Sequence, residues 1–174
     1  MNTLIKRCFV MVALIMITGC GATDFQSKMP DSFQLRQGQT IEFPPIENST
    51  GKALDPPADQ IFNEYMAQLL RERQLLHTAA TQPPTLILKT KLIEYEAGNA
   101  AARWVLPGLG TTICTVHAEL LDKSNGALQG RMQARQTVSF GGAYSIGADT
   151  YICKRAADDL IKEIDKNMEK KSAG

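Results

Sequence analysis

Two alternating runs of apolar and polar residues most constrain what this chain can fold into. Successive side chains of a β-strand point to opposite faces, so a strict alternation predicts a strand with one buried and one solvated face. The first run alternates Cys114, Val116, Ala118 and Leu120 with Thr115, His117 and Glu119, and the second alternates Leu128, Gly130, Met132, Ala134, Gln136, Val138 and Phe140 with polar residues.

A short polar segment joins these two runs. Residues 122–126 read DKSNG, and an Asn-Gly pair tolerates the positive φ angles of a tight turn. The sequence therefore predicts an antiparallel hairpin. A third strand is predicted upstream, where Leu86, Leu88 and Leu92 share a face, and the chain is expected to reverse direction across residues 98–110.

Two helices and one further strand complete the predicted fold. Asp55 precedes two prolines and a helical apolar pattern, which predicts a helix over about 56–76. Asp149 is expected to cap a second helix that reaches about residue 168. Residues 40–46 contain two prolines and predict an edge or terminating strand. The fold class is therefore α+β: a two-layer α/β sandwich, order β-α-β-β-β-α, with a mostly antiparallel sheet and helices on one face.

The N-terminus reads as a targeting segment. Lys6 and Arg7 precede an apolar run that is too short to cross a bilayer as a helix. The run ends in Ile17-Thr-Gly-Cys20, which resembles the lipobox of bacterial lipoproteins, in which the cysteine accepts diacylglycerol and becomes the mature N-terminus, with fatty acids such as palmitate. The alternative is an ordinary secretory signal beside an unmodified Cys20. By analogy with enterobacterial sorting, Gly21 favours the outer membrane, with the domain facing the periplasm.

These observations divide the chain into four parts. We expect a lipoprotein signal peptide at 1–19, a lipidated flexible tether at 20–39, a single α/β domain at 40–168 and a disordered tail at 169–174. The tether is predicted because residues 21–39 show neither helical nor strand periodicity. A net charge of +1 over 174 residues argues against nucleic acid as a partner.

The loop between the first two long strands has an unusual composition. Residues 97–111 read AGNAAARWVLPGLGT and include four large apolar side chains, although connecting loops are normally polar. Either the loop packs into the core or it contacts another molecule. The candidate contact residues are Gly98, Arg103, Trp104, Pro107, Gly108 and Gly110.

This loop, the lipobox, the hairpin and the closing helix together carry a family resemblance. Over about residues 41–168 the chain resembles a family of bacterial lipoproteins known only as a domain of unknown function, although Thr111, Thr112 and Cys114 depart from the pattern. The element order is more distantly similar to the α/β domains of the curli-secretion lipoprotein CsgG and the TolB N-terminus. That similarity implies a role in an envelope assembly, as an analogy of fold.

Few residues suggest a catalytic, metal-binding or redox role. Cys114 and Cys153 are both expected to face the core, where they form either a disulfide or two inert thiols. The two histidines, His77 and His117, are too few for a histidine-rich metal site, and Glu94 and Glu96 are better explained as charges at a strand end. We predict no catalytic residues, no metal and no cofactor.

The predicted function is that of an outer-membrane lipoprotein acting as a structural or interaction module in cell-envelope assembly or transport, and not an enzyme. Its partners are expected to be the membrane, through the N-terminal lipid, and an envelope protein; the oligomeric state stays open. The alternative is a periplasmic small-ligand binder or envelope enzyme that uses the Arg103-Trp104 loop. Arg131 and Arg135 form a polar stripe, either solvated and paired with Glu119 or a docking surface.

Overall fold

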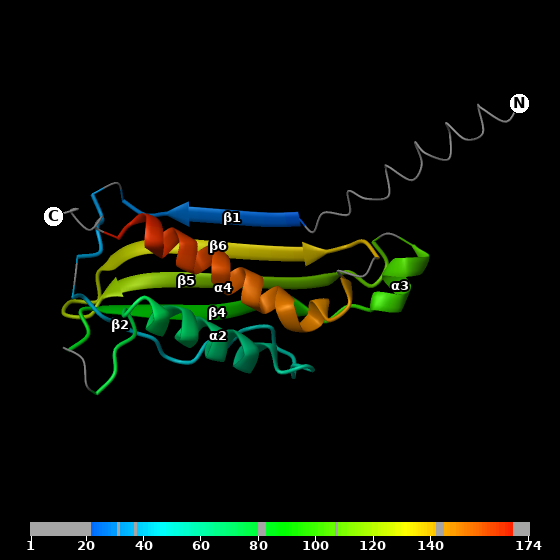
Figure 1. Cartoon of the computed structure of the whole chain (residues 1–174), viewed down its shortest axis with the longest axis horizontal. Coiled ribbons are helices and arrows are strands. Elements are labelled where there is room, and N and C mark those ends of the chain that lie inside the picture. Colours follow the sequence, from blue (N-terminus) through cyan, green and yellow to red (C-terminus); the bar gives the residue numbers. More distant parts are fainter. Residues whose placement is uncertain are drawn as a thin grey trace, which may run out of the picture.

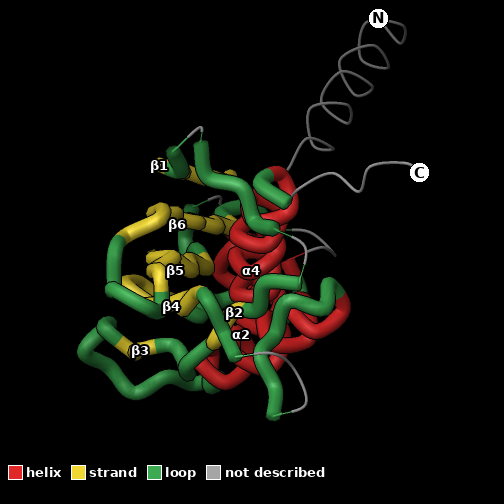
Figure 2. The backbone as a smooth tube through the Cα atoms, turned by 90° about the vertical axis from the view of Figure 1, so that its left-hand side faces the viewer, coloured by secondary structure: helices red, strands yellow, loops and turns green. Residues whose placement is uncertain are grey.

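The computed structural model describes residues 22–30, 32–36, 38–79, 83–106, 108–141 and 145–168. Within these residues a six-stranded sheet forms one layer, and helices α2 and α4 cover one of its faces (Figures 1 and 2). This arrangement confirms the predicted α+β class. The elements in chain order are β1 (Ala22–Lys28), β2 (Ile41–Glu42), β3 (Glu47–Asn48), α2 (Ala58–Glu72), β4 (Leu86–Glu96), α3 (Ala100–Val105), β5 (Thr112–Asp122), β6 (Leu128–Val138) and α4 (Ala148–Lys166).

The sheet is built on the three long strands. Its order is β1-β6-β5-β4-β2, and β3 also pairs with β4. Neighbours β4, β5 and β6 run antiparallel, which confirms the reversal across residues 98–110, whereas the short β2 and β3 run parallel to β4. The predicted hairpin forms as expected: the Ser124 N–H donates to Asp122 Oδ1 at 2.8 Å, and Gly126 takes a φ of 70°.

The alternating faces of the strands decide where the core lies. Cys114, Val116, Ala118 and Leu120 are buried beneath the helices, whereas His117 on the opposite face is exposed. The helices supply the other half of this core through their apolar sides. The fully buried helical residues with the largest side chains are Phe62, Met66 and Leu70 of α2 and Ile152, Leu160, Ile161 and Ile164 of α4.

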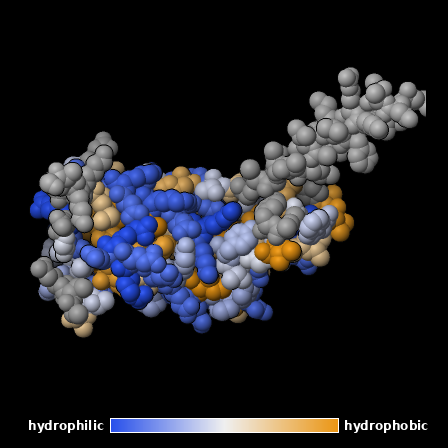
Figure 3. All heavy atoms as spheres, in the orientation of Figure 1, coloured by the Kyte–Doolittle hydropathy of each residue, from blue (hydrophilic) through white to orange (hydrophobic). Residues whose placement is uncertain are grey.

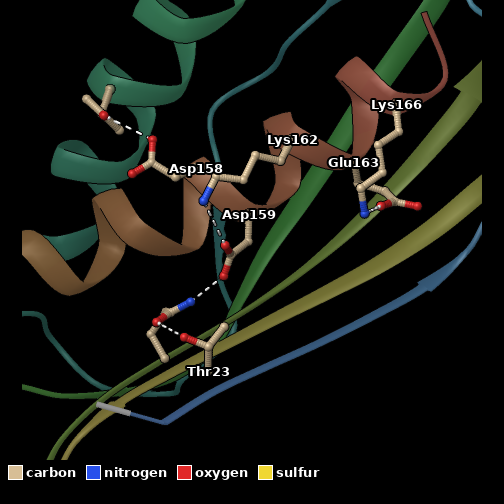
Figure 4. Close-up of polar contacts among 8 residues, drawn as sticks. Thr23, Asp158, Asp159, Lys162, Glu163 and Lys166 are labelled. Atoms are coloured by element: carbon tan, nitrogen blue, oxygen red, sulfur yellow. Dashed lines mark hydrogen bonds and ion pairs between the residues drawn. The ribbon is translucent and has the colours of Figure 1, made fainter. Parts of the chain in front are cut away.

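The predicted flexible tether is wrong for residues 22–28. Ala22–Lys28 is strand β1, which pairs antiparallel with β6 from Ala22↔Thr137 to Lys28↔Arg131. Side chains support the pairing: the Thr23 hydroxyl donates to Gln136 at 3.0 Å, and Gln136 in turn donates to Asp159 of α4 (Figure 4). Further along, Leu35 is buried and its N–H donates to the Asn167 carbonyl at 2.7 Å. The folded unit therefore includes described residues before position 40, from Ala22 on.

Two local predictions also differ from the structure. The loop 97–111 contains the short helix α3, which Asn99 caps because its Oδ1 accepts the Ala102 N–H at 3.0 Å. The predicted caps Asp55 and Asp149 do not cap, since α2 begins after Pro57 and α4 after Gly147, and neither start has a capping side-chain bond. Gly147, with a φ of 72°, occupies the N-cap position of α4, and Asp149 lies in the first turn of the helix.

Candidate functional site

The candidate site is one end of the sheet, where four chain segments meet. β4 ends there, β5 begins there, β6 ends there and α4 begins there, and α3 closes the end (Figure 1). We call the described residues of 97–111 and 139–147 the tip. The antiparallel order of the long strands brings these two stretches together, although they are far apart in the sequence.

Arg103 holds the tip together from the inside. Only 3% of this residue is exposed. Its Nη1 donates to the Gly110 carbonyl at 2.5 Å and to Thr112 Oγ1 at 2.6 Å, and its Nη2 donates to the Ser145 carbonyl at 2.9 Å. A guanidinium stays charged at all physiological pH values and offers several donors in a fixed plane. Arg103 therefore ties α3 to the start of β5 and to the segment before α4.

The backbone of the tip crosses itself too closely for side chains at two glycines. Gly98 has a φ of 70°, and a Cβ there would lie 2.5 Å from the Gly110 carbonyl oxygen. Gly110 has a φ of 69°, and its Cβ would lie 2.6 Å from the Asn99 carbonyl oxygen. The Asn99 N–H donates to the Gly110 carbonyl at 2.8 Å, so the two ends of the loop are closed onto each other. These glycines set the shape of the loop rather than a ligand site.

The outer surface of the tip is apolar. Six of the eight large hydrophobic side chains that are exposed in the described part of the chain lie here. Trp104 is 62% exposed and Val105 is 81% exposed. Figure 3 shows hydrophobic atoms gathered at this end of the molecule, beside the largely hydrophilic surface over the helices. We call these six residues the apolar patch: Trp104, Val105, Leu106, Leu109, Phe140 and Ile146.

Close contacts join the two halves of the patch. The Gly108 N–H donates to the Ser139 carbonyl at 2.8 Å. A Cβ at Gly141 would lie 2.8 Å from the Trp104 Cα, which shows how closely the segment after β6 packs on α3. Phe140 therefore belongs to the same surface as Trp104, and Ile146 follows Ser145, whose carbonyl binds Arg103.

A family model matches residues 45–142, more than half of the chain. Its description is "Domain of unknown function (DUF4410)". The chain belongs to this family. The matched region of this DUF4410 chain runs from just before β3 to the middle of the tip and includes Arg103 and Trp104. No functionally curated protein matched the sequence.

Solved structures with a similar fold support the architecture. A PelC dodecamer from Paraburkholderia phytofirmans in space group P6 is 18% identical, with a TM-score of 0.55 over 80% of this chain and 97% of that one. A point mutant of that protein, in space group C2, gives 20% identity and a TM-score of 0.53 over the same shares. A DUF4136 family protein from Bacteroides thetaiotaomicron is 7% identical, with a TM-score of 0.51 over 84% of this chain and 97% of that one. The distant likeness to CsgG and TolB stays a prediction.

The structure brings most of the predicted contact loop together, but it gives the neighbours Arg103 and Trp104 opposite roles. Arg103 faces inward and Trp104 faces outward. Gly98, Gly108 and Gly110 lie in the same tip, whereas Pro107 and the predicted lipid site Cys20 lie outside the described residues. The sequence predicted Phe140 on the buried face of the second hairpin strand, but β6 ends at Val138 and Phe140 is exposed, and no role was predicted for Ile146. The available signal was that residues 136–148 carry no charged side chain.

The predicted cysteine pair is close in space. The sulfur atoms of Cys114 and Cys153 lie 3.1 Å apart, both residues are buried, and the structure holds them as free thiols. The hydrogen bond to Cys153 and burial raise the pKa of the Cys114 thiol well above its ordinary value. A disulfide between them stays a prediction.

Charged residues on the outer face of the sheet form ion pairs with one another. Arg131 pairs with Glu119 at 2.9 Å, as expected, while Arg135 pairs with Glu94. Glu96 pairs with Lys52 at 2.5 Å, so Glu94 and Glu96 each form an ion pair with a basic side chain. A shallow hollow of about 250 Å³ lies beside Arg131, on the outer face of β1, β6 and β5.

The described residues contain neither a metal cluster nor a membrane-spanning helix. Among them, no group of three or more His, Cys, Asp or Glu side chains is placed to hold a metal ion. None of their helices has the length and apolar character needed to cross a membrane.

Proposed function

We propose that this DUF4410 chain is a lipoprotein of the outer membrane, anchored through Cys20, whose domain faces the periplasm and works as a non-catalytic interaction module. The single observation that carries the proposal is the tip. A buried arginine and two closely packed glycines fix a short helix so that six apolar side chains face outward. Exposed apolar patches rimmed by polar residues mark contacts with proteins or membranes.

The surroundings of the patch support contact rather than catalysis. A catalytic or small-molecule site needs a concave pocket with convergent polar groups. The charged group nearest to Trp104 in the sequence is Arg103, and its guanidinium is held inside the tip by three oxygen atoms. The Arg103-Trp104 loop therefore offers an apolar surface to a partner, with its one cation turned inward.

The lipobox supports the location. Lipidation at Cys20 would attach acyl chains that contribute about 0.8 kcal/mol of membrane affinity per buried methylene group. A domain held in this way acts on partners at the membrane surface, which suits a module of envelope assembly or transport.

The proposal is tested by the chemical accessibility of the tip. A Val105→Cys variant and a matched Leu128→Cys variant both place a thiol at an exposed apolar position, one in the patch and one at the opposite end of β6. Cys114 and Cys153 are buried and give a low background. A water-soluble maleimide is expected to label the residue-105 thiol much more slowly in intact envelopes than in detergent-solubilised protein, while the residue-128 thiol labels equally in both. Equal labelling of residue 105 in the two settings would refute an interaction surface at the tip.

A further inference from the structure

We infer that the partner of the apolar patch is the membrane itself: the tip inserts into the interface of the bilayer that holds the lipid on Cys20. This inference rests on the proposed function, because it names the partner of the same surface. Residue Ala22, the first residue of β1, lies only two positions after Cys20.

The start of β1 lies at the tip. Ala22 pairs with Thr137, the residue before the end of β6, and Phe140 follows three residues later. β1 runs from this end of the molecule toward the opposite one (Figure 1). Two residues of chain span at most about 7 Å, so a lipid attached two positions before Ala22 would be tied closely to this end of the sheet. A lipid on Cys20 would therefore keep this end of the sheet close to the bilayer.

The composition of the tip suits an interfacial position. Arg103 is the one formally charged residue between Glu96 and Glu119, and it is buried. No charged residue occurs from 136 to 148. Charged side chains oppose insertion into the hydrocarbon region, whereas tryptophan is enriched at the boundary between headgroups and acyl chains. Apart from the buried Arg103, the tip itself carries no charged side chain, and its exposed Trp104 and Val105 match this boundary.

Insertion of the tip would fix the orientation of the domain on the membrane, whereas the lipid on Cys20 would supply the anchor. The lipid alone holds the chain at the membrane, but a single attachment point leaves the domain free to tilt. A second contact at the tip would stand the long strands upright on the bilayer. The 122–126 turn at the far end of the β5-β6 hairpin would then point into the periplasm. Interfacial apolar groups reach about 5–10 Å into the boundary layer, a depth that the patch side chains can occupy without unfolding α3.

The experiment uses the single tryptophan of the chain. Because Trp104 is the only one, the intrinsic tryptophan fluorescence of the lipidated protein reports on the tip alone. The protein is reconstituted into phosphatidylethanolamine and phosphatidylglycerol vesicles with or without brominated acyl chains. We expect a blue-shifted emission in vesicles, loss of most of that emission with brominated lipid, and protection from iodide in the water.

A matched control places the tryptophan elsewhere on the same anchored protein. In the double variant Trp104→Phe with Leu128→Trp, the ring lies at the start of β6, ten residues from its end, or roughly 33 Å along the strand. Its emission is expected to be quenched by iodide and unaffected by brominated lipid. Equal bromine quenching at positions 104 and 128 would show general closeness to the bilayer and overturn the inference.

Other outcomes separate the inference from the proposed function. If Trp104 in vesicles stays open to iodide and is not quenched by brominated lipid, the membrane is not its partner and the inference is wrong. The proposed function still stands in that case if the residue-105 thiol is protected in intact envelopes, which would indicate a protein partner. Exposure of residue 105 in both settings would refute both.

Discussion

Replacing Arg103 by methionine tests whether this side chain organises the tip. Methionine keeps an unbranched apolar stem but is shorter and cannot donate to the three oxygens that Arg103 binds. Hydrogen bonds to a charged group contribute about 1.5 kcal/mol each at the low end, so three of them amount to about 4–5 kcal/mol. Release of the buried guanidinium from its desolvation offsets part of that, and we expect a net loss of about 3 kcal/mol.

Thermal unfolding followed by circular dichroism measures this loss. For a domain of about 150 residues, 1 kcal/mol shifts Tm by about 2–4 °C, so Arg103→Met is expected to lower Tm by roughly 6–12 °C. The matched control is Arg131→Met, because the Arg131 side chain is 63% exposed and its ion pair with Glu119 lies at the surface. Such pairs contribute less than about 1 kcal/mol.

The variant Arg103→Lys separates the effect of the positive charge from that of the planar guanidinium group. Lysine keeps the positive charge but lacks the planar fork that reaches the Gly110 and Ser145 carbonyls together. We expect its Tm to lie between those of the wild type and Arg103→Met. A Tm for Arg103→Met that equals that of Arg131→Met would refute the idea that the buried guanidinium holds the tip.

Four further predictions concern the anchor, the patch and the thiols. Cys20→Ser is expected to release the protein from the membrane fraction, and unchanged fractionation and processing would contradict lipidation. Trp104→Ala is expected to lower the free energy of unfolding by less than about 1 kcal/mol, because the side chain is exposed. The control Phe62→Ala, in the core, should lower it by about 3–5 kcal/mol. Similar losses for the two variants would place Trp104 in the core. Alkylation of the folded, reduced protein is expected to stay slow even at about pH 9, because Cys114 is buried with a raised pKa, and rapid modification would contradict this burial. Oxidation of Cys114 and Cys153 to a disulfide should stabilise the domain by about 4 kcal/mol on the chain-entropy model. If both thiols alkylate in protein that is purified from cells and unfolded without reduction, the bond is excluded.

The fold was predictable where a pattern repeats. The hairpin follows from alternation on both sides of DKSNG, and both long helices follow from apolar residues at helical spacing. β1 was not predictable in this way, because Phe25 is its only large apolar residue. This strand depends on backbone pairing with the open edge of β6, and a partner more than 100 residues away leaves no local signal.

The apolar composition of the candidate site was predictable, but which of its side chains face inward or outward was not. The apolar character of residues 97–111 marked the loop as unusual, yet nothing local showed which side chains would face inward. Arg103 turns inward because the fold brings the Ser145 carbonyl, 42 residues away, within 2.9 Å of its guanidinium. Once that contact is made, the next residue on the short helix, Trp104, is left facing the solvent.

Photo-crosslinking from the tip tests the central claim most directly. A photo-reactive amino acid is placed at Val105 or, as the matched control, at Leu128. Intact cells are irradiated, and the protein is then purified and its mass is measured by mass spectrometry. The claim that the tip is the contact surface and meets the bilayer predicts phospholipid adducts from position 105 and few or none from position 128. Adducts in equal yield from both positions, or none from position 105, would contradict it.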